Sequence, residues 1–227
     1  MNGPDGVAPL GQARILLRPI GSPLPLGFVA LGAGSITLSG LQIGWLPTTE
    51  SHQAALVLLA FVAPLQLLSA VFGFLARDSV GGTGMGILAG SWLVIGTITI
   101  ASPAGSTTRV LGLVLCFVSV GLLVPIVAAS LGKILAALVM LGAAVRFGFT
   151  GITEITGSPS WEHASGWWGF GLALLALYAA FAFEIEDTRR RTVLPTGRHG
   201  AGLAALNGRL GHNLERVAHE AGVREQL

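Results

Sequence analysis

Two charged side chains lie inside one long apolar segment of the sequence. Arg146 and Glu154 both fall within residues 134–155, which are mostly apolar or small. On an α-helix their separation of eight residues corresponds to about 12 Å along the axis and to roughly the same face. A charge within a membrane costs roughly 3 kcal/mol or more, so it usually faces a cavity or a partner. Arg146 is therefore a candidate for attracting an anion, with Glu154 near the outer mouth of a path. The alternative is a structural ion pair or network, within one subunit or between subunits.

Motifs that mark catalytic or metal sites are absent from the sequence. It contains no HExxH, CxxC, GxSxG or P-loop pattern. The single cysteine, Cys116, lies in an apolar run and excludes an internal disulfide. We therefore expect no enzyme activity, no cofactor and no bound metal.

The composition is that of a membrane protein. Hydrophobic residues make up 52% of the 227 residues and charged residues only 11%, with a mean hydropathy of +0.74. Soluble domains carry about 25% charged residues, so most of this surface must face lipid or other protein. The net charge of +2 implies no general attraction to nucleic acid.

Six apolar segments are long enough to cross a bilayer. A spanning helix needs about 20 apolar residues, and the sequence offers such segments at 25–46, 53–76, 83–101, 110–130, 134–155 and 166–183. Turn and charge signals separate them. We therefore predict an all-α, polytopic membrane protein with six transmembrane helices. Pro64 and Pro125 fall inside the second and fourth segments, where each removes a backbone hydrogen bond and is expected to kink its helix.

The basic residues predict the orientation. With six spans, 11 of the 13 Lys and Arg residues fall on one side: Arg14, Arg18, Arg77, Lys133, Arg189, Arg190, Arg191, Arg198, Arg209, Arg216 and Arg224. Positive residues concentrate on the cytoplasmic side, so both termini are expected there. The predicted organisation is an N-terminal tail (1–21), a six-helix domain (22–188) and a basic C-terminal tail (189–227).

The C-terminal tail carries its own pattern. Apolar residues recur at steps of three and four, which predicts an amphipathic helix, at Leu203, Leu206, Leu210, Leu214, Val217 and Ala221. Such a helix would lie on the inner leaflet or pack against neighbouring subunits. A loosely ordered tail is at least as consistent with the two glycines at 208 and 211.

Two short motifs resemble those of a known family. Residues 22–28 read Ser-Pro-Leu-Pro-Leu-Gly-Phe at the start of the first span, and residues 191–197 read Arg-Thr-Val-Leu-Pro-Thr-Gly after the last. Together with six spans and a Gly166-Trp167 start to the last helix, they resemble the acetate uptake transporter family, the succinate–acetate permeases. The resemblance covers about residues 22–200. Pro23 and Pro25 are expected to hold an extended segment before the helix, whose free N–H groups favour an anion.

The resemblance implies a hexamer in which each protomer has its own path for acetate or related carboxylates. In the family, bulky side chains from the first, third and fifth helices narrow this path. Those positions fall on Leu31, Leu88 and Ala143, where aromatic residues and a leucine are usual. Ser22 replaces a family asparagine, and Arg146 and Glu154 are not family features.

These observations predict transport of acetate or related short-chain carboxylates, such as lactate or succinate, across the cytoplasmic membrane, by a proton-coupled transporter or an anion channel. The expected partners are the carboxylate, membrane lipid and further copies of the chain. The alternatives are a transporter or channel for another small solute such as ammonium, and a non-transporting scaffold or sensor. The residues that we place along the path are Pro23, Pro25, Leu26, Phe28, Leu31, Gln66, Leu88, Ala143, Arg146 and Glu154.

Overall fold

The computed structural model describes residues 21–189, 191–200 and 203, and within them the chain is helical with no named strand. The elements are α1 (Leu24–Gln42), η1 (Thr48–Glu50), α2 (Ser51–Val57), η2 (Leu58–Val62), α3 (Ala63–Leu75), α4 (Ser79–Ala101), α5 (Arg109–Gly121), α6 (Leu123–Ser130), α7 (Ile134–Thr156) and α8 (Pro159–Arg189). The amphipathic helix predicted from Leu203 onward lies outside the described residues, apart from Leu203 itself, and so does nearly all of the N-terminal tail.

The six predicted spans are confirmed. Within the described part of the chain, six helices are long and apolar enough to cross a membrane: Leu24–Gln42, Thr48–Leu75, Ser79–Ala101, Arg109–Ser130, Ile134–Thr156 and Pro159–Arg189. The last span begins earlier than predicted, because Pro159 opens α8 instead of ending a loop. Proline is well suited to the first helical turn, where its missing N–H is not needed. With 31 residues, α8 is about 46 Å long and exceeds the bilayer core of about 30 Å.

Both internal prolines lie beside an interruption of their helix, as expected. A prolyl nitrogen cannot donate to the carbonyl four residues earlier. Pro64 follows the π-helical turn η2, and α3 begins at its neighbour Ala63. Pro125 lies just after the break between α5 and α6. The carbonyl that receives no hydrogen bond from it, four residues earlier, belongs to Gly121, the last residue of α5.

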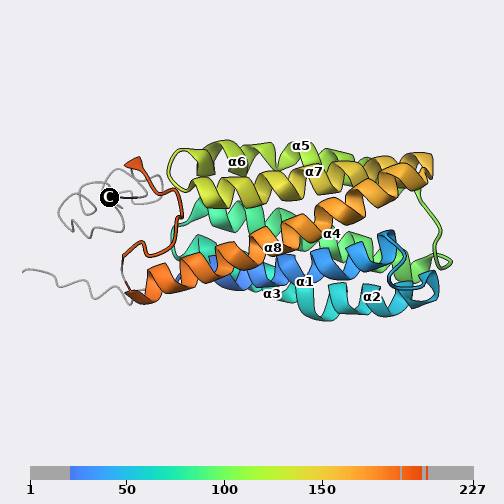
Figure 1. The fold of residues 1–227 in the computed structure, drawn as a ribbon, viewed down its shortest axis with the longest axis horizontal. Coiled ribbons are helices and arrows are strands. Elements are labelled where there is room, and N and C mark those ends of the chain that lie inside the picture. Colours follow the sequence, from blue (N-terminus) through green and yellow to red (C-terminus); the bar gives the residue numbers. More distant parts are fainter. Residues whose placement is uncertain (1–20, 190, 201–202, 204–227) are drawn as a thin grey trace, which may run out of the picture.

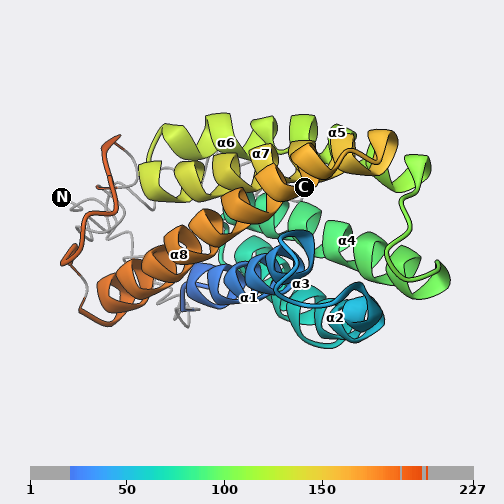
Figure 2. The ribbon, with the colours of Figure 1, turned by 45° about the vertical axis from the view of Figure 1, so that its right-hand side comes forward.

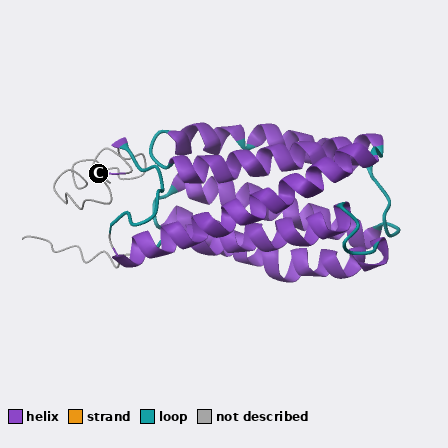
Figure 3. Ribbon diagram, in the orientation of Figure 1, coloured by secondary structure: helices purple, strands orange, loops and turns teal. Residues whose placement is uncertain are grey.

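The helices form one elongated bundle with connecting loops at its two ends (Figures 1 and 3). α1 packs along α8, α3 along α4, and α5 along α7, and Figure 2 shows α1 beside α8 with α5 and α6 on the far side of α7. Small residues permit the close pairs. A Cβ added to Gly112 of α5 would lie 2.7 Å from the carbonyl oxygen of Gly151 in α7, so these two backbones are nearly in contact.

The glycine-rich start of α4 packs within the protomer. An added Cβ at Gly82 would lie 2.8 Å from the ring of Phe74, and one at Gly84 would lie 2.5 Å from Met140. These glycines therefore allow α3 and α7 to approach α4. Their close contacts do not require a second copy of the chain.

The outer surface of the bundle is apolar. The exposed face of α5 carries Val110, Leu113, Phe117 and Val120, and Phe117 is 75% exposed. Near the end of the bundle that holds the α7–α8 turn, Trp45 and Trp167 lie edge to face with ring centroids 6.4 Å apart. Aromatic side chains of this kind gather at the membrane–water interface. The described bundle is thus a multi-pass membrane protein.

Residues 191–200, which we term the strap, fold back across one end of the bundle (Figure 1). The carbonyls of Thr196 and Gly197 accept hydrogen bonds from the N–H groups of Leu135 and Ile134, at 3.2 and 3.4 Å. The first N–H groups of a helix have no partner within it. The strap therefore caps the start of α7.

A buried carboxylate ties the strap to α8. Glu186 is 1% exposed and accepts hydrogen bonds from the hydroxyls of Thr192 (3.0 Å) and Thr196 (2.9 Å) as well as an ion pair from Arg198. Nearby, Lys133 pairs with Asp78 at the start of α4. The sequence motif at 191–197 thus joins α7 and α8 at this end, which we term the strap end.

Candidate functional site

Arg146 lies fully buried in α7, surrounded by polar groups from α1 and α8. Its Nη1 donates to Ser39 Oγ at 2.8 Å and to the Ser165 carbonyl at 3.2 Å. Its Nη2 donates to Gln42 Oε1 at 3.4 Å. Helical spacing aligns these groups, because Ser39 and Gln42 are three residues apart on α1. Every acceptor of the guanidinium is thus electrically neutral.

The charge of Arg146 is not compensated within the described chain. A guanidinium has five N–H donors, and the three hydrogen bonds leave two without an acceptor, including that of Nε. The described residues contribute no carboxylate to an ion pair with Arg146. A buried charge normally has a charged partner because desolvation is costly. The arrangement therefore has the properties of an anion site.

Gly169 provides the space for this guanidinium. A Cβ added at Gly169 of α8 would lie 1.2 Å from Arg146 Nη1 and 2.1 Å from Ser39 Oγ. No side chain other than hydrogen fits there without moving the arginine. The site thus depends on a glycine of the sixth span as well as on the arginine of the fifth.

A polar pocket of about 110 Å³ lies at the end of the bundle opposite the strap, which we term the pocket end. Hydroxyl and carboxylate side chains contribute much of its lining, which includes Thr48, Ser51, Thr99, Ser106, Thr107, Thr150, Thr153, Glu154 and Glu162. Gln42 also lines the pocket and contacts Arg146. Arg146, the candidate anion site, therefore lies directly behind one wall of a polar pocket.

Glu154 lines the polar pocket at the pocket end of the bundle. Its carboxylate accepts a hydrogen bond from the backbone N–H of Thr108 at 2.7 Å. It makes no ion pair with Arg146, because the arginine points to α1 and α8. An ion pair between these two residues within one subunit is therefore not formed. A structural network around Arg146, the other form of that alternative, is consistent with its hydrogen bonds to Ser39, Ser165 and Gln42.

The three residues expected at the constriction are all completely buried: Leu31 on α1, Leu88 on α4 and Ala143 on α7. One helical turn further along α4 and α7 lie Trp92 and Phe147, whose ring centroids are 5.5 Å apart. The indole of Trp92 packs on α1 where Gly34 leaves room, 3.1 Å from a Cβ added there. An aromatic layer thus lies beside the expected constriction.

Sequence reasoning missed this aromatic layer. Leu88 and Trp92, like Ala143 and Phe147, are four residues apart and therefore share a helix face. This spacing could have predicted that the two rings lie next to the expected constriction. The indole N–H of Trp92 is buried and has no hydrogen-bond acceptor among the described residues.

The opening motif shapes the strap end of α1. Pro23 has helical backbone angles (φ −79°, ψ −10°), so the extended segment expected before the helix is wrong: α1 begins at once. The Pro23 carbonyl accepts a hydrogen bond from Ser69 of α3 at 2.7 Å. Pro25 is buried in the first turn, and Leu26 lies on the outer surface at 36% exposure.

Two further path candidates pack between helices. Phe28 is buried against Phe183 of α8, with ring centroids 5.9 Å apart. Gln66 of α3 is also buried, and its Nε2 donates to the Gly27 carbonyl at 3.2 Å while its Oε1 has no partner. Gln66 therefore holds α3 against α1.

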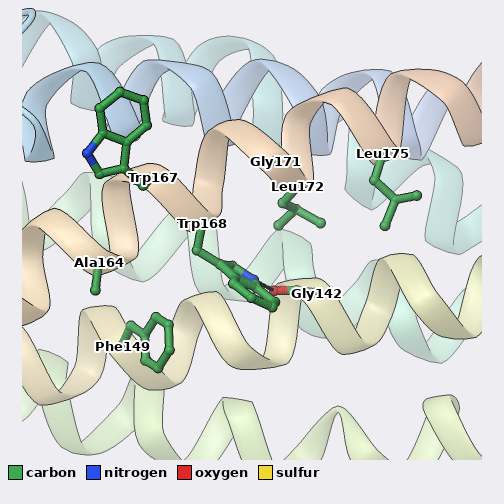
Figure 4. Close-up of a pocket in the computed structure, with 8 residues that line it drawn as sticks. All are labelled: Gly142, Phe149, Ala164, Trp167, Trp168, Gly171, Leu172 and Leu175. Carbon is green, nitrogen blue, oxygen red and sulfur yellow. Dashed lines mark hydrogen bonds between the residues drawn. The ribbon is translucent and has the colours of Figure 1, made fainter.

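A larger cavity lies elsewhere. A groove of about 610 Å³ between α7 and α8 is lined by apolar and aromatic residues: Gly142, Phe149, Ala164, Trp167, Trp168, Gly171, Leu172 and Leu175. Figure 4 shows the Trp168 ring over α7, where its Nε1 donates to the Gly142 carbonyl at 2.8 Å. The residues that line this groove carry no charge, which suits an apolar occupant better than an anion.

Comparison with known proteins gives a likeness in structure. No protein-family model matches the sequence, and no curated protein matches it. The structure is similar to that of the bacterial acetate channel SatP, with a TM-score of 0.70 and 22% sequence identity over 78% of this chain and 99% of that chain. That neighbour is a channel and not an enzyme. No group of His, Cys, Asp and Glu among the described residues has a metal-binding arrangement. The chain therefore has the fold of an acetate channel, in agreement with the acetate uptake transporter family that its two motifs indicate.

Proposed function

We propose that this protein carries acetate and related short-chain carboxylates across a membrane, along a path through its own helical bundle. The observation that carries the proposal is Arg146, a buried cation with neutral partners and two N–H groups without acceptors. A carboxylate would supply the missing negative charge and the missing acceptors, and arginine binds carboxylates by two parallel hydrogen bonds. The same positive charge opposes passage of ammonium.

The proposed path runs from the polar pocket past Arg146, then past the aromatic layer, and then between the three buried constriction residues, Leu31, Leu88 and Ala143. All three are closed off from solvent in this structure, so passage requires side-chain movement. The fold shared with an acetate channel supports this assignment.

Ala143 determines the size of solute that passes in this proposal. Ala143→Leu adds volume to a fully buried position and should hinder the larger solute more. Since one added carbon group in an apolar site changes discrimination by roughly tenfold or more, lactate flux relative to acetate flux should fall by about that factor. The measurement is uptake of both acids into proteoliposomes. An unchanged ratio would place the constriction elsewhere.

The function itself is tested with purified protein in proteoliposomes. Radiolabelled acetate, lactate, succinate and ammonium are each supplied with and without an imposed pH gradient. Uptake of carboxylates above that of empty vesicles is expected, and its response to the gradient distinguishes a proton-coupled transporter from an anion channel. Accumulation of ammonium alone would exclude the proposal, and no uptake at all would favour a scaffold or sensor.

The pocket end faces the outside of the cytoplasmic membrane in this proposal, with both termini in the cytoplasm. The distribution of basic residues supports this orientation. A cysteine placed at Ser160 should then react with an impermeant reagent added to intact cells, whereas one placed at Gly200 should not. The reverse pattern would invert the topology. We also propose the hexamer implied by the family resemblance, and a monomeric mass in native membranes would oppose it.

A further inference from the structure

Gln42 lies between the polar pocket and Arg146. It is the last residue of α1 and is 7% exposed. It lines the pocket, although Arg146 does not. Its Oε1 accepts the hydrogen bond from Arg146 Nη2, and its Nε2 donates to Thr150 Oγ1. A solute in the pocket therefore meets the Gln42 amide before it meets the guanidinium.

The hydrogen bonds that hold this amide are long. They measure 3.4 Å to Arg146 and 3.3 Å to Thr150, whereas N–H···O bonds are usually about 2.7–3.2 Å. The backbone also changes direction here, since α1 ends and Gly44 follows with φ +78°. The side chain of Gln42 is therefore weakly held at the end of its helix.

The amide oxygen of Gln42 occupies a position suited to a carboxylate oxygen. It accepts from Arg146 Nη2 while the neighbouring Nε has no acceptor. The amide offers the guanidinium one neutral acceptor, whereas a carboxylate offers two charged oxygens that can accept from Nη2 and Nε in parallel. A carboxylate that displaced the amide would therefore gain more from Arg146 than the amide loses.

We propose that Gln42 is a displaceable plug of the Arg146 site: it closes the site toward the polar pocket, and a small carboxylate reaches Arg146 by replacing its amide. This inference rests on the proposed carboxylate transport. It assigns to Gln42 a role in controlling access, distinct from the attraction exerted by Arg146. Displacement of the amide also leaves the Thr150 hydroxyl free to contact the incoming anion. This hydroxyl hydrogen-bonds with Ser165 Oγ at 2.7 Å.

Three variants test the plug. Gln42→Ala removes it, and Gln42→Glu replaces the amide oxygen by a carboxylate of the same shape that cannot leave Arg146 easily. Thr37→Ala is the matched control, because Thr37 lies on the same helix as Gln42 and its hydroxyl donates to the Ala33 carbonyl of that helix. It neither lines the polar pocket nor is among the partners of Arg146. Access is measured without transport, by the rate at which external 2,3-butanedione, a small uncharged arginine reagent, modifies Arg146 in proteoliposomes, followed by peptide mass spectrometry.

Gln42→Ala should speed modification of Arg146 severalfold, and acetate should protect Arg146 from the reagent. Gln42→Glu should reduce acetate uptake by about tenfold or more, because its ion pair competes with the substrate. Thr37→Ala should behave as wild type in both assays. Modification that is equally fast in wild type and Gln42→Ala, or full uptake by Gln42→Glu, overturns the plug even where wild-type carboxylate uptake is normal. Absence of uptake in the wild type would instead refute the proposed function. If Gln42→Ala does not fold, the isosteric Gln42→Glu decides the matter alone.

Discussion

Replacing Arg146 with glutamine is expected to remove most carboxylate uptake and to leave the protein at least as stable as the wild type. The two effects have one origin. Arg146 is a fully buried charge with neutral partners only, and the effective desolvation penalty of such an ion is on the order of several kcal/mol. Removing the charge relieves that penalty. It also removes an attraction of about 4 kcal/mol between unit charges at 4 Å, at an effective dielectric constant of about 20.

We therefore expect uptake of acetate and lactate to fall by about tenfold or more, with an unchanged or higher melting temperature in detergent. Arg146→Lys is the control, because it keeps the charge but not the planar fork, and it should retain part of the activity. A melting temperature that falls, or loss of the assembled protein, would show instead that the arginine holds the bundle together.

Gly169→Ala is expected to be nearly as damaging by a different route. The new Cβ would lie 1.2 Å from Arg146 Nη1 and 2.4 Å from Cζ, so the guanidinium must leave its position. Overpacking of this kind costs about 1–3 kcal/mol. Both the melting temperature and carboxylate uptake should therefore fall, unlike in Arg146→Gln, where only uptake should fall.

A neighbouring glycine supplies the matched control. Gly171 lies two residues further along α8, and an added Cβ there meets no atom within 4 Å. Gly171→Ala should therefore leave uptake intact and be neutral or slightly stabilising, because alanine favours a helix over glycine. In the Arg146→Ala background Gly169→Ala should cost less stability than in the wild type, with Ser39 Oγ at 2.1 Å accounting for the remainder. If Gly169→Ala lowered the stability equally in both backgrounds, its effect would not arise from a clash with the arginine.

The number of spans could be predicted because apolar length alone determines it. Each of the six helices has a stretch with high hydropathy, and the bilayer requires about 20 such residues. Helix ends were predicted less well. Pro159 looks like a loop residue in isolation, although it opens α8, because proline is compatible with both a turn and the first helical turn.

The site was only partly accessible from the sequence. Arg146 could be identified because a charge within an apolar segment is costly. Its partners could not, since Ser39 and Gln42 are 107 and 104 residues distant along the chain and are common residue types. Gly169 gave no signal at all, because nothing in its local sequence distinguishes a glycine that accommodates a guanidinium from one that faces lipid. Contacts of this kind depend on how α1, α7 and α8 approach one another.

The two ends of the bundle differ in the interactions that hold their loops together. At the strap end, opposite charges join the loops: Lys133 pairs with Asp78, and Arg198 with Glu186. At the pocket end, the described loops are held by hydrogen bonds to backbone groups, such as those between His52 and the Ser102 carbonyl and between Thr108 and Glu154. Dissolved salt screens partly exposed ion pairs over a Debye length of about 8 Å at physiological ionic strength. Salt should screen the Lys133–Asp78 pair, since its side chains are 25% and 21% accessible to solvent. The packing of the loops at the strap end should consequently loosen as the ionic strength rises, whereas that of the loops at the pocket end should change little.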